Sequence, residues 1–116
     1  ANECMEEIMK PHQKVKALTG KDMILFRPPY GDYNNTLIQT LKGCNYYGIQ
    51  WDVDSRDWES QNTEAVCSAV LPNVKDGSII LMHDGYRATV EALRRIVKEL
   101  KEEGYTFVTV RELIEE

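Results

Sequence analysis

Polar side chains with catalytic potential follow three separate apolar runs of the chain. Arg27 follows the first run, Asp54 and Asp57 follow the second, and His83 follows the third. Histidine titrates near neutrality and can donate a proton to a leaving group, while a carboxylate on its second ring nitrogen fixes the tautomer. Arginine can orient a carboxylate through paired hydrogen bonds. These residue types predict acid–base chemistry, with Asp57 or Asp54 as the partner of His83.

Each of these residues also has a structural interpretation. Asp54 and Asp57 suit turn and helix-cap positions, and the segment Pro28–Gly31 suits a rigid turn. Trp58 can pack against the protein, or it can stack on a sugar and form an apolar wall of a site. A single histidine after a strand is more often structural than catalytic. The catalytic interpretation is favoured because all these groups fall at equivalent places, directly after a strand.

Apolar periodicity predicts helices and strands in alternation, and therefore an α/β fold with a parallel sheet and right-handed crossovers. Pro11 is expected to kink the first helix or divide it in two. The carboxyl ends of parallel strands form the rim where such folds bind ligands, so the three polar segments are expected at one rim. The expected strands cover residues 23–26, 46–53, 78–82 and 105–110, and the expected helices residues 3–18, 34–43, 62–74, about 93–104 and 111–116.

Composition narrows the function classes. The 116 residues carry 14 Lys and Arg against 19 Asp and Glu, a net charge of −5. This acidic balance disfavours a nucleic-acid partner, and no apolar run approaches the ~20 residues of a membrane span. The three cysteines form no CxxC pair, so a thiolate zinc site is not expected. We expect a single unit without linker or repeat.

Three segments in this order resemble the polysaccharide deacetylases of carbohydrate esterase family 4. They are Phe26–Gly31, Trp51–Trp58 and Ile80–Gly85, and the second is most similar to bacterial peptidoglycan or spore-type deacetylases. Members of this family remove acetyl groups from chitin, peptidoglycan, xylan and related glycans. The resemblance implies a hydrolase with a glycan substrate, located in the cell envelope or secreted. It also implies four parallel β/α units that form the C-terminal half of a distorted (β/α) deacetylase barrel.

The resemblance implies catalytic roles for four residues. Arg27 would hold the catalytic-base aspartate, and His83 would be the general acid that protonates the departing amine. Asp57, with Asp54 in reserve, would orient and tune His83.

Three further residues would bind the substrate. Tyr30 would offer its backbone N–H to the oxyanion hole, Trp58 would shape one wall of the groove, and Leu81 would line the pocket for the acetyl methyl group.

Two motifs of the family are absent from the sequence. Neither the Thr-Phe-Asp-Asp-Gly strand end nor the His-Ser/Thr-x-x-His segment occurs, and the two histidines are His12 and His83. Metal activation of water needs three protein ligands. The family implies zinc or another divalent metal, with ligands that are not in this chain. We therefore expect residues 1–116 to be the C-terminal part of a metal-dependent N-acetylglucosamine deacetylase domain and to be inactive alone.

Two other functions remain open. The chain can be a glycan-binding or assembly module without catalysis, which would use Trp58 and Tyr30. A glycoside hydrolase that uses Asp54 and Asp57 as its carboxylate pair is less favoured, because Arg27 and His83 would have no role. Half a barrel leaves an apolar inner face and two sheet edges, so self-association or pairing with the missing half is expected.

Overall fold

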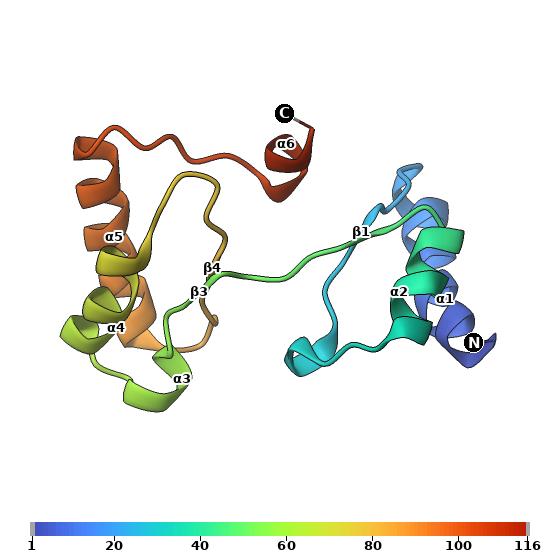
Figure 1. The fold of residues 1–116 in the computed structure, drawn as a ribbon, viewed down its shortest axis with the longest axis horizontal. Helices are drawn as coiled ribbons and strands as arrows, with labels where there is room; N and C mark the ends of the chain where they lie inside the picture. Colours follow the sequence, from blue (N-terminus) through green and yellow to red (C-terminus); the bar gives the residue numbers. More distant parts are fainter. Residues whose placement is uncertain (1, 116) are drawn as a thin grey trace. The chain divides into compact units, whose positions relative to one another are not determined.

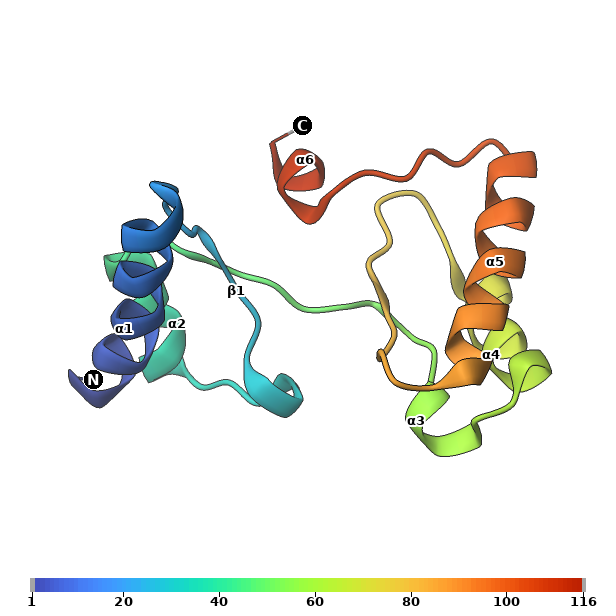
Figure 2. The ribbon, with the colours of Figure 1, turned by 180° about the vertical axis from the view of Figure 1, so that it is seen from behind.

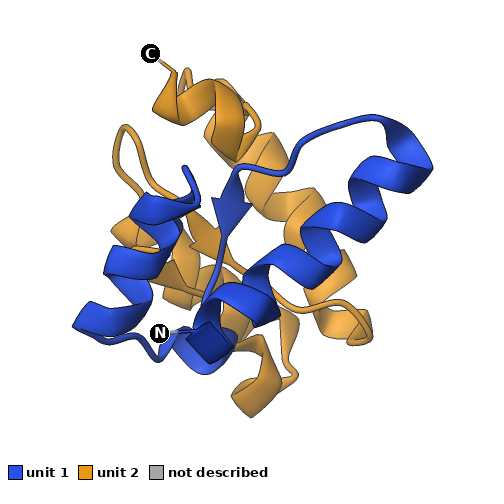
Figure 3. Cartoon of the chain, turned by 90° about the vertical axis from the view of Figure 1, so that its right-hand side faces the viewer, with its two compact units in different colours: residues 1–50 blue, residues 51–116 orange. Residues whose placement is uncertain are grey.

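The computed structural model describes residues 2–115 (Figure 1, Figure 2). The chain divides into two compact units, residues 1–50 and 51–116, where the sequence indicated one (Figure 3). The assignment of the whole chain to one catalytic domain stays a prediction.

Unit 1 packs two helices beside a short parallel pair of strands. Its core is formed by Ile8, Leu41 and Tyr46, all buried. The side chain of Asn34 caps the second helix by accepting the Leu37 N–H at 2.9 Å, as expected for asparagine before a helix. The elements are α1 (Asn2–Thr19), β1 (Leu25–Phe26), the 3₁₀ turn η1 (Pro29–Gly31), α2 (Asn35–Gly43) and β2 (Tyr47–Gly48).

Of the two alternatives expected at Pro11, the division into two helices was wrong, and the kink stays a prediction. Helix α1 runs without interruption from Asn2 to Thr19 with Pro11 inside it. A proline removes one backbone donor, but the buried Ile8 anchors the same turn of the helix in the core.

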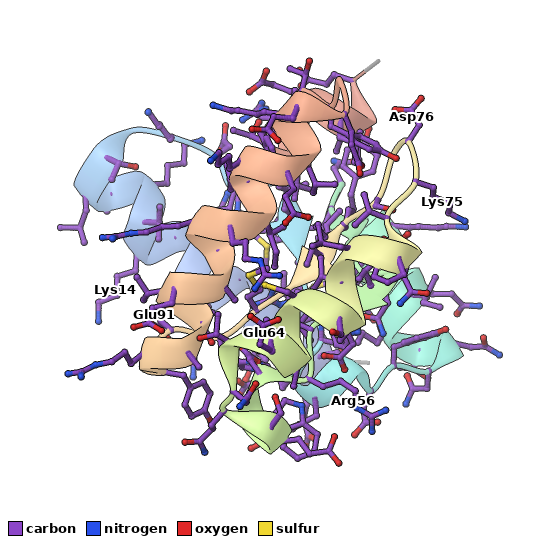
Figure 4. All side chains as sticks on the ribbon, turned by 90° about the vertical axis from the view of Figure 1, so that its left-hand side faces the viewer. Lys14, Arg56, Glu64, Lys75, Asp76 and Glu91 are labelled. Atoms are coloured by element: carbon purple, nitrogen blue, oxygen red, sulfur yellow. The ribbon has the colours of Figure 1, made fainter. Side chains whose placement is uncertain are left out.

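Unit 2 has its core between two helices and a second parallel pair of strands. The fully buried side chains Val66 and Val70 of α4 face Ile96 and Leu100 of α5. Glu64 on α4 pairs with Arg95 on α5 at the surface of this contact; Glu64 is labelled in Figure 4. The elements are β3 (Val53–Asp54), α3 (Asp57–Ser60), α4 (Thr63–Val70), the 3₁₀ turn η2 (Leu71–Asn73), β4 (Ile80–Leu81), α5 (Arg87–Glu102) and α6 (Val110–Ile114).

The predicted strand over residues 46–53 is split between the units. Its first part, β2, pairs with β1, and its last part, β3, pairs in parallel with β4 in the register Val53 to Ile80. The Ile49 N–H is bonded to the Phe26 carbonyl in unit 1, and the Asp52 N–H is bonded to the Ile79 carbonyl in unit 2. The α/β class with parallel strands is confirmed.

The predicted strand over residues 105–110 is absent from the part of the chain that the structure describes. A strand needs a ladder of backbone hydrogen bonds, but the Tyr105 N–H bonds to the Leu100 carbonyl at the end of α5. Thr109 and Glu112 then form a capping box that starts α6 at Val110. None of the described helices is long and apolar enough to cross a membrane.

Candidate functional site

Asp57 lies at the end of a tight turn that follows β3. The Asp54 carboxylate accepts the Arg56 N–H at 2.9 Å, and Arg56 adopts a left-handed conformation with φ 54° and ψ 30°. This turn starts α3 at Asp57, whose side chain is fully buried. The hydrogen bond within this turn therefore fixes the backbone position of Asp57.

The Asp57 carboxylate accepts four hydrogen bonds. Oδ1 accepts the Trp58 N–H at 2.9 Å and lies 2.8 Å from Nδ1 of His83. Oδ2 accepts the His83 backbone N–H at 2.7 Å and the Thr89 hydroxyl at 2.8 Å. Two partners on each oxygen satisfy a buried carboxylate, which otherwise would be costly to bury.

These hydrogen bonds set the ionisation of Asp57. Burial by itself raises the pKa of the carboxyl, but the hydrogen bonds from the His83 N–H, the His83 ring and Thr89 outweigh it and hold the pKa below its ordinary value. Asp57 is therefore a carboxylate at neutral pH.

His83 follows β4 and presents a partly exposed imidazole. Its side chain is 43% exposed, whereas Asp57 on the other side of the contact is fully buried. Because the carboxylate can only accept, Nδ1 of His83 carries a proton in this contact. Nε2 is left to take up and release the second proton, which is the geometry that a general acid needs.

The structure decides between the two aspartates as partner of the histidine. Asp57 contacts His83, whereas Asp54 is exposed and caps the turn before α3. Trp58 is 51% exposed and available to a ligand, and Leu81 is partly buried in β4, two residues before His83.

Arg27 and Tyr30 belong to unit 1. Arg27 is exposed and follows β1, and within residues 2–115 it forms no ion pair. Tyr30 is 97% exposed and adopts φ 57°, ψ 11° inside η1. A non-glycine residue in this region is strained, and such strain is typical of functional turns. That these two residues share a rim with His83 stays a prediction.

Two residues near Asp57 were missed in the sequence. Thr89, in the first turn of α5, is buried and donates to Asp57. Ser55 is fully buried, and its hydroxyl has no hydrogen-bond partner among the described residues. A polar residue in the first turn of an amphipathic helix is normally read as a surface or cap residue, so the pattern carried no signal for Thr89.

The described residues do not fit a metal site. Within residues 2–115 no group of three His, Cys, Asp or Glu side chains is arranged to hold a metal ion. His12, in unit 1, instead bonds Tyr46 Oη at 2.7 Å and Asp22 Oδ1 at 3.2 Å.

Known proteins similar to this chain are deacetylases of glycans. A family model described as polysaccharide deacetylase matches residues 1–49. A peptidoglycan-N-acetylglucosamine deacetylase of Bacillus cereus is 42% identical over 99 residues, which cover 81% of this chain and 46% of that protein. A bifunctional xylanase/deacetylase of Pseudobutyrivibrio xylanivorans is 44% identical over 104 residues, which cover 87% of this chain and 17% of that protein.

Solved structures agree with the sequence comparisons. The peptidoglycan deacetylase PdaC from Bacillus subtilis has a TM-score of 0.84 at 33% identity, with 98% of this chain and 55% of that chain covered. A carbohydrate esterase family 4 pseudoenzyme from Bacillus anthracis has a TM-score of 0.88 at 28% identity, with 97% and 40% covered. The chain spans about half the length or less of these relatives. The resemblance to the family is thus confirmed, and the chain belongs to the polysaccharide deacetylase family, carbohydrate esterase family 4.

Proposed function

We propose that this chain contributes the general-acid part of an N-deacetylase site that hydrolyses acetamide groups of N-acetylglucosamine in peptidoglycan or chito-oligosaccharides. The observation that carries the proposal is the contact between the fully buried Asp57 and the partly exposed His83, with Nε2 left for proton exchange. The name of the Bacillus cereus relative, a peptidoglycan-N-acetylglucosamine deacetylase, supports this substrate class. The Bacillus subtilis relative is named for the N-acetylmuramic acid of peptidoglycan, so it supports peptidoglycan and not the choice of sugar.

The reaction requires a proton at the leaving nitrogen. Water adds to the acetamide carbon, the C–N bond of the tetrahedral intermediate breaks, and acetate and a free amine are formed. Expulsion of an amine without protonation is slow, and His83 Nε2–H supplies that proton in our proposal. Asp57 holds the Nδ1–H side of the ring and stabilises the imidazolium.

The other predicted residues complete the proposed site. Arg27 orients the catalytic base, and the backbone N–H of Tyr30 stabilises the oxyanion of the intermediate. Trp58 and Leu81 contact the sugar and the acetyl methyl group. The exposure of Trp58 and the left-handed turn at Tyr30 support these assignments.

The catalytic base and the metal ligands come from outside this chain in our proposal. The family is generally metal-dependent, and the described residues hold no group that fits a metal. We therefore propose that the chain is inactive alone and pairs with a segment that carries those ligands. Robust deacetylation of an acetylated chito-oligosaccharide by the 116-residue chain with added zinc would overturn this proposal.

Substitution of His83 tests the assigned acid. In the longer protein that also carries the metal ligands, His83→Ala should lower kcat by orders of magnitude, about 10²–10⁴-fold, because the leaving amine loses its proton donor. Circular dichroism establishes that the variant is folded. A near-normal kcat in a folded variant would remove His83 from the acid role.

A non-catalytic glycan-binding or assembly module is the second candidate. It is favoured by one finding, that a similar structure is a family 4 pseudoenzyme. Isothermal titration of the metal-free monomer with chito-oligosaccharide distinguishes the two functions. Saturable binding, with no turnover in the longer protein at any metal concentration, would support the module and contradict the enzyme.

The cell envelope or the extracellular space is the proposed location. The support is the substrate named for the Listeria monocytogenes and Bacillus subtilis relatives, which is peptidoglycan. Fractionation of cells followed by immunodetection tests the location.

A further inference from the structure

We infer that Thr89 is a positioning residue for the acid pair: its hydroxyl holds Oδ2 of Asp57, so that Oδ1 faces Nδ1 of His83. The catalytic role of this hydrogen bond rests on the proposed function, whereas the positioning of Asp57 by Thr89 does not. Neither the three family-like segments nor the predicted site contains Thr89.

The donors to Asp57 differ in origin. Trp58 is the next residue in the chain, and His83 supplies both its backbone N–H and its ring from the segment after β4. Thr89 is, within residues 2–115, the donor that α5 provides to this carboxylate. One hydrogen bond thus comes from the short helix α3, two come from the segment after β4, and one comes from the long helix α5.

Helix α5 is a rigid support for this hydroxyl. Its inner face carries Ala92, Ile96 and Leu100, which are buried in the core of unit 2. Thr89 is 6% exposed and continues the same buried face toward the start of the helix. A functional group supported by a packed element is held more precisely than one supported by loops. Because the packing of α5 fixes Thr89, the Thr89 hydroxyl in turn fixes the position of the Asp57 carboxylate.

Loss of the hydroxyl has two separable consequences. Oδ2 would keep the His83 N–H as its single remaining partner. With one donor fewer, the ionised form of the Asp57 carboxyl is stabilised less than in the wild type, and the group is freer to rotate. Rotation of the carboxyl group weakens the contact with Nδ1, so the His83 ring is no longer restricted to one tautomer. Valine matches threonine in shape without the hydroxyl, and serine keeps the hydroxyl without the methyl group.

NMR spectroscopy of the 116-residue chain tests the inference directly. The chain has two histidines, so His12 serves as an internal reference for His83. In Thr89→Val, the pKa of Asp57, followed through its carboxyl ¹³C shift, should rise by about one unit. The ¹⁵N shifts of neutral His83 should change from a single Nδ1–H tautomer to a mixture, and Thr89→Ser should restore both signals.

Several results would overturn the inference. One is a folded Thr89→Val variant in which the Asp57 titration and the His83 tautomer are both unchanged; another is Thr89→Ser behaving like Thr89→Val. If Thr89→Val does not fold, the wild-type chain still decides. The Thr89 hydroxyl proton should exchange slowly and its shift should follow the Asp57 titration, and a hydroxyl signal that ignores this titration contradicts the inference.

Kinetics connect the positioning to catalysis. In the longer protein, Thr89→Val should lower kcat about tenfold with little change in KM, because orientation of the acid is lost while substrate contacts remain. The NMR result stands whether or not the protein proves to be a deacetylase. Unchanged kcat together with altered NMR signals would confine Thr89 to a structural role.

Discussion

Asp57 contacts His83 at two points: Oδ1 lies 2.8 Å from the ring Nδ1, and Oδ2 accepts the backbone N–H of the same residue at 2.7 Å. One carboxylate thereby fixes both the backbone and the ring of the histidine. The contact also joins α3 to the segment after β4 inside unit 2. The stability of the unit and the orientation of the proposed acid therefore depend on the same buried group.

Asp57→Asn should destabilise unit 2 by about 3 kcal/mol. The asparagine NH₂ would face N–H or O–H donors, of which the two backbone N–H groups cannot reverse. Urea unfolding followed by tryptophan fluorescence measures this, because Trp51 and Trp58 both lie in unit 2. Asp54→Asn is the matched control and should cost less than about 1 kcal/mol, since its amide oxygen can keep the hydrogen bond from Arg56. Equal losses of unfolding free energy in the two variants would contradict the conclusion that the buried Asp57 carboxylate stabilises unit 2 more than the exposed Asp54 does.

The free energy of unfolding should fall at acid pH in a way that depends on Asp57. Its folded-state pKa lies below the ordinary value of 3.8, because hydrogen bonds from His83 and Thr89 outweigh the opposing effect of burial. A carboxyl with a depressed folded-state pKa stabilises the fold fully above its unfolded pKa, and this contribution is lost as the pH falls through the folded-state value.

The measurement is the urea midpoint between pH 2 and 6, where about pH 4 marks the onset of the loss. Asp57→Asn should flatten this dependence. A smaller slope should remain from Asp52, whose pKa is also lowered because hydrogen bonds from the Ile79 N–H and the Ser78 hydroxyl outweigh burial. An identical acid slope in wild type and Asp57→Asn would show that Asp57 does not titrate as described.

Tyr46→Phe should destabilise unit 1 by about 1 kcal/mol. The Tyr46 ring is buried in the core, and its hydroxyl bonds His12 Nδ1 at 2.7 Å. Tyr47→Phe is the matched control in the next position: it is 56% exposed, and its hydroxyl has no hydrogen-bond partner among the described residues. Thermal unfolding followed by far-ultraviolet circular dichroism compares the pair. A larger decrease in thermal stability for Tyr47→Phe than for Tyr46→Phe would mean that the hydrogen bond between Tyr46 and His12 does not stabilise unit 1.

Tyr30→Gly should retain most of the activity of the longer protein. Glycine keeps the backbone N–H that we propose for the oxyanion hole, and it adopts φ 57° without strain. We expect kcat within about tenfold of wild type, whereas loss of an oxyanion donor costs about 10²–10³-fold. A loss of that larger size in a folded variant would show that the Tyr30 side chain, rather than its backbone, does the chemistry.

Two predictions that depend on neighbouring residues in the chain were confirmed. Asn34 caps α2, and the amphipathic pattern that contains Ile96 and Leu100 forms α5. The strand over residues 105–110 failed because β-structure needs a partner strand, and the local capping box at Thr109 favours a helix instead.

The sequence by itself determined the family, the α/β class and the set of residues with catalytic potential, because these follow from residue types in a fixed order. The tertiary structure alone decided that Asp57, and not Asp54, is the partner of His83. It also brought Thr89 to the same carboxylate from a different element. The reason is physical: a hydrogen bond is set by distance and direction in space, and the spacing of residues along a chain does not specify which donors meet a buried acceptor.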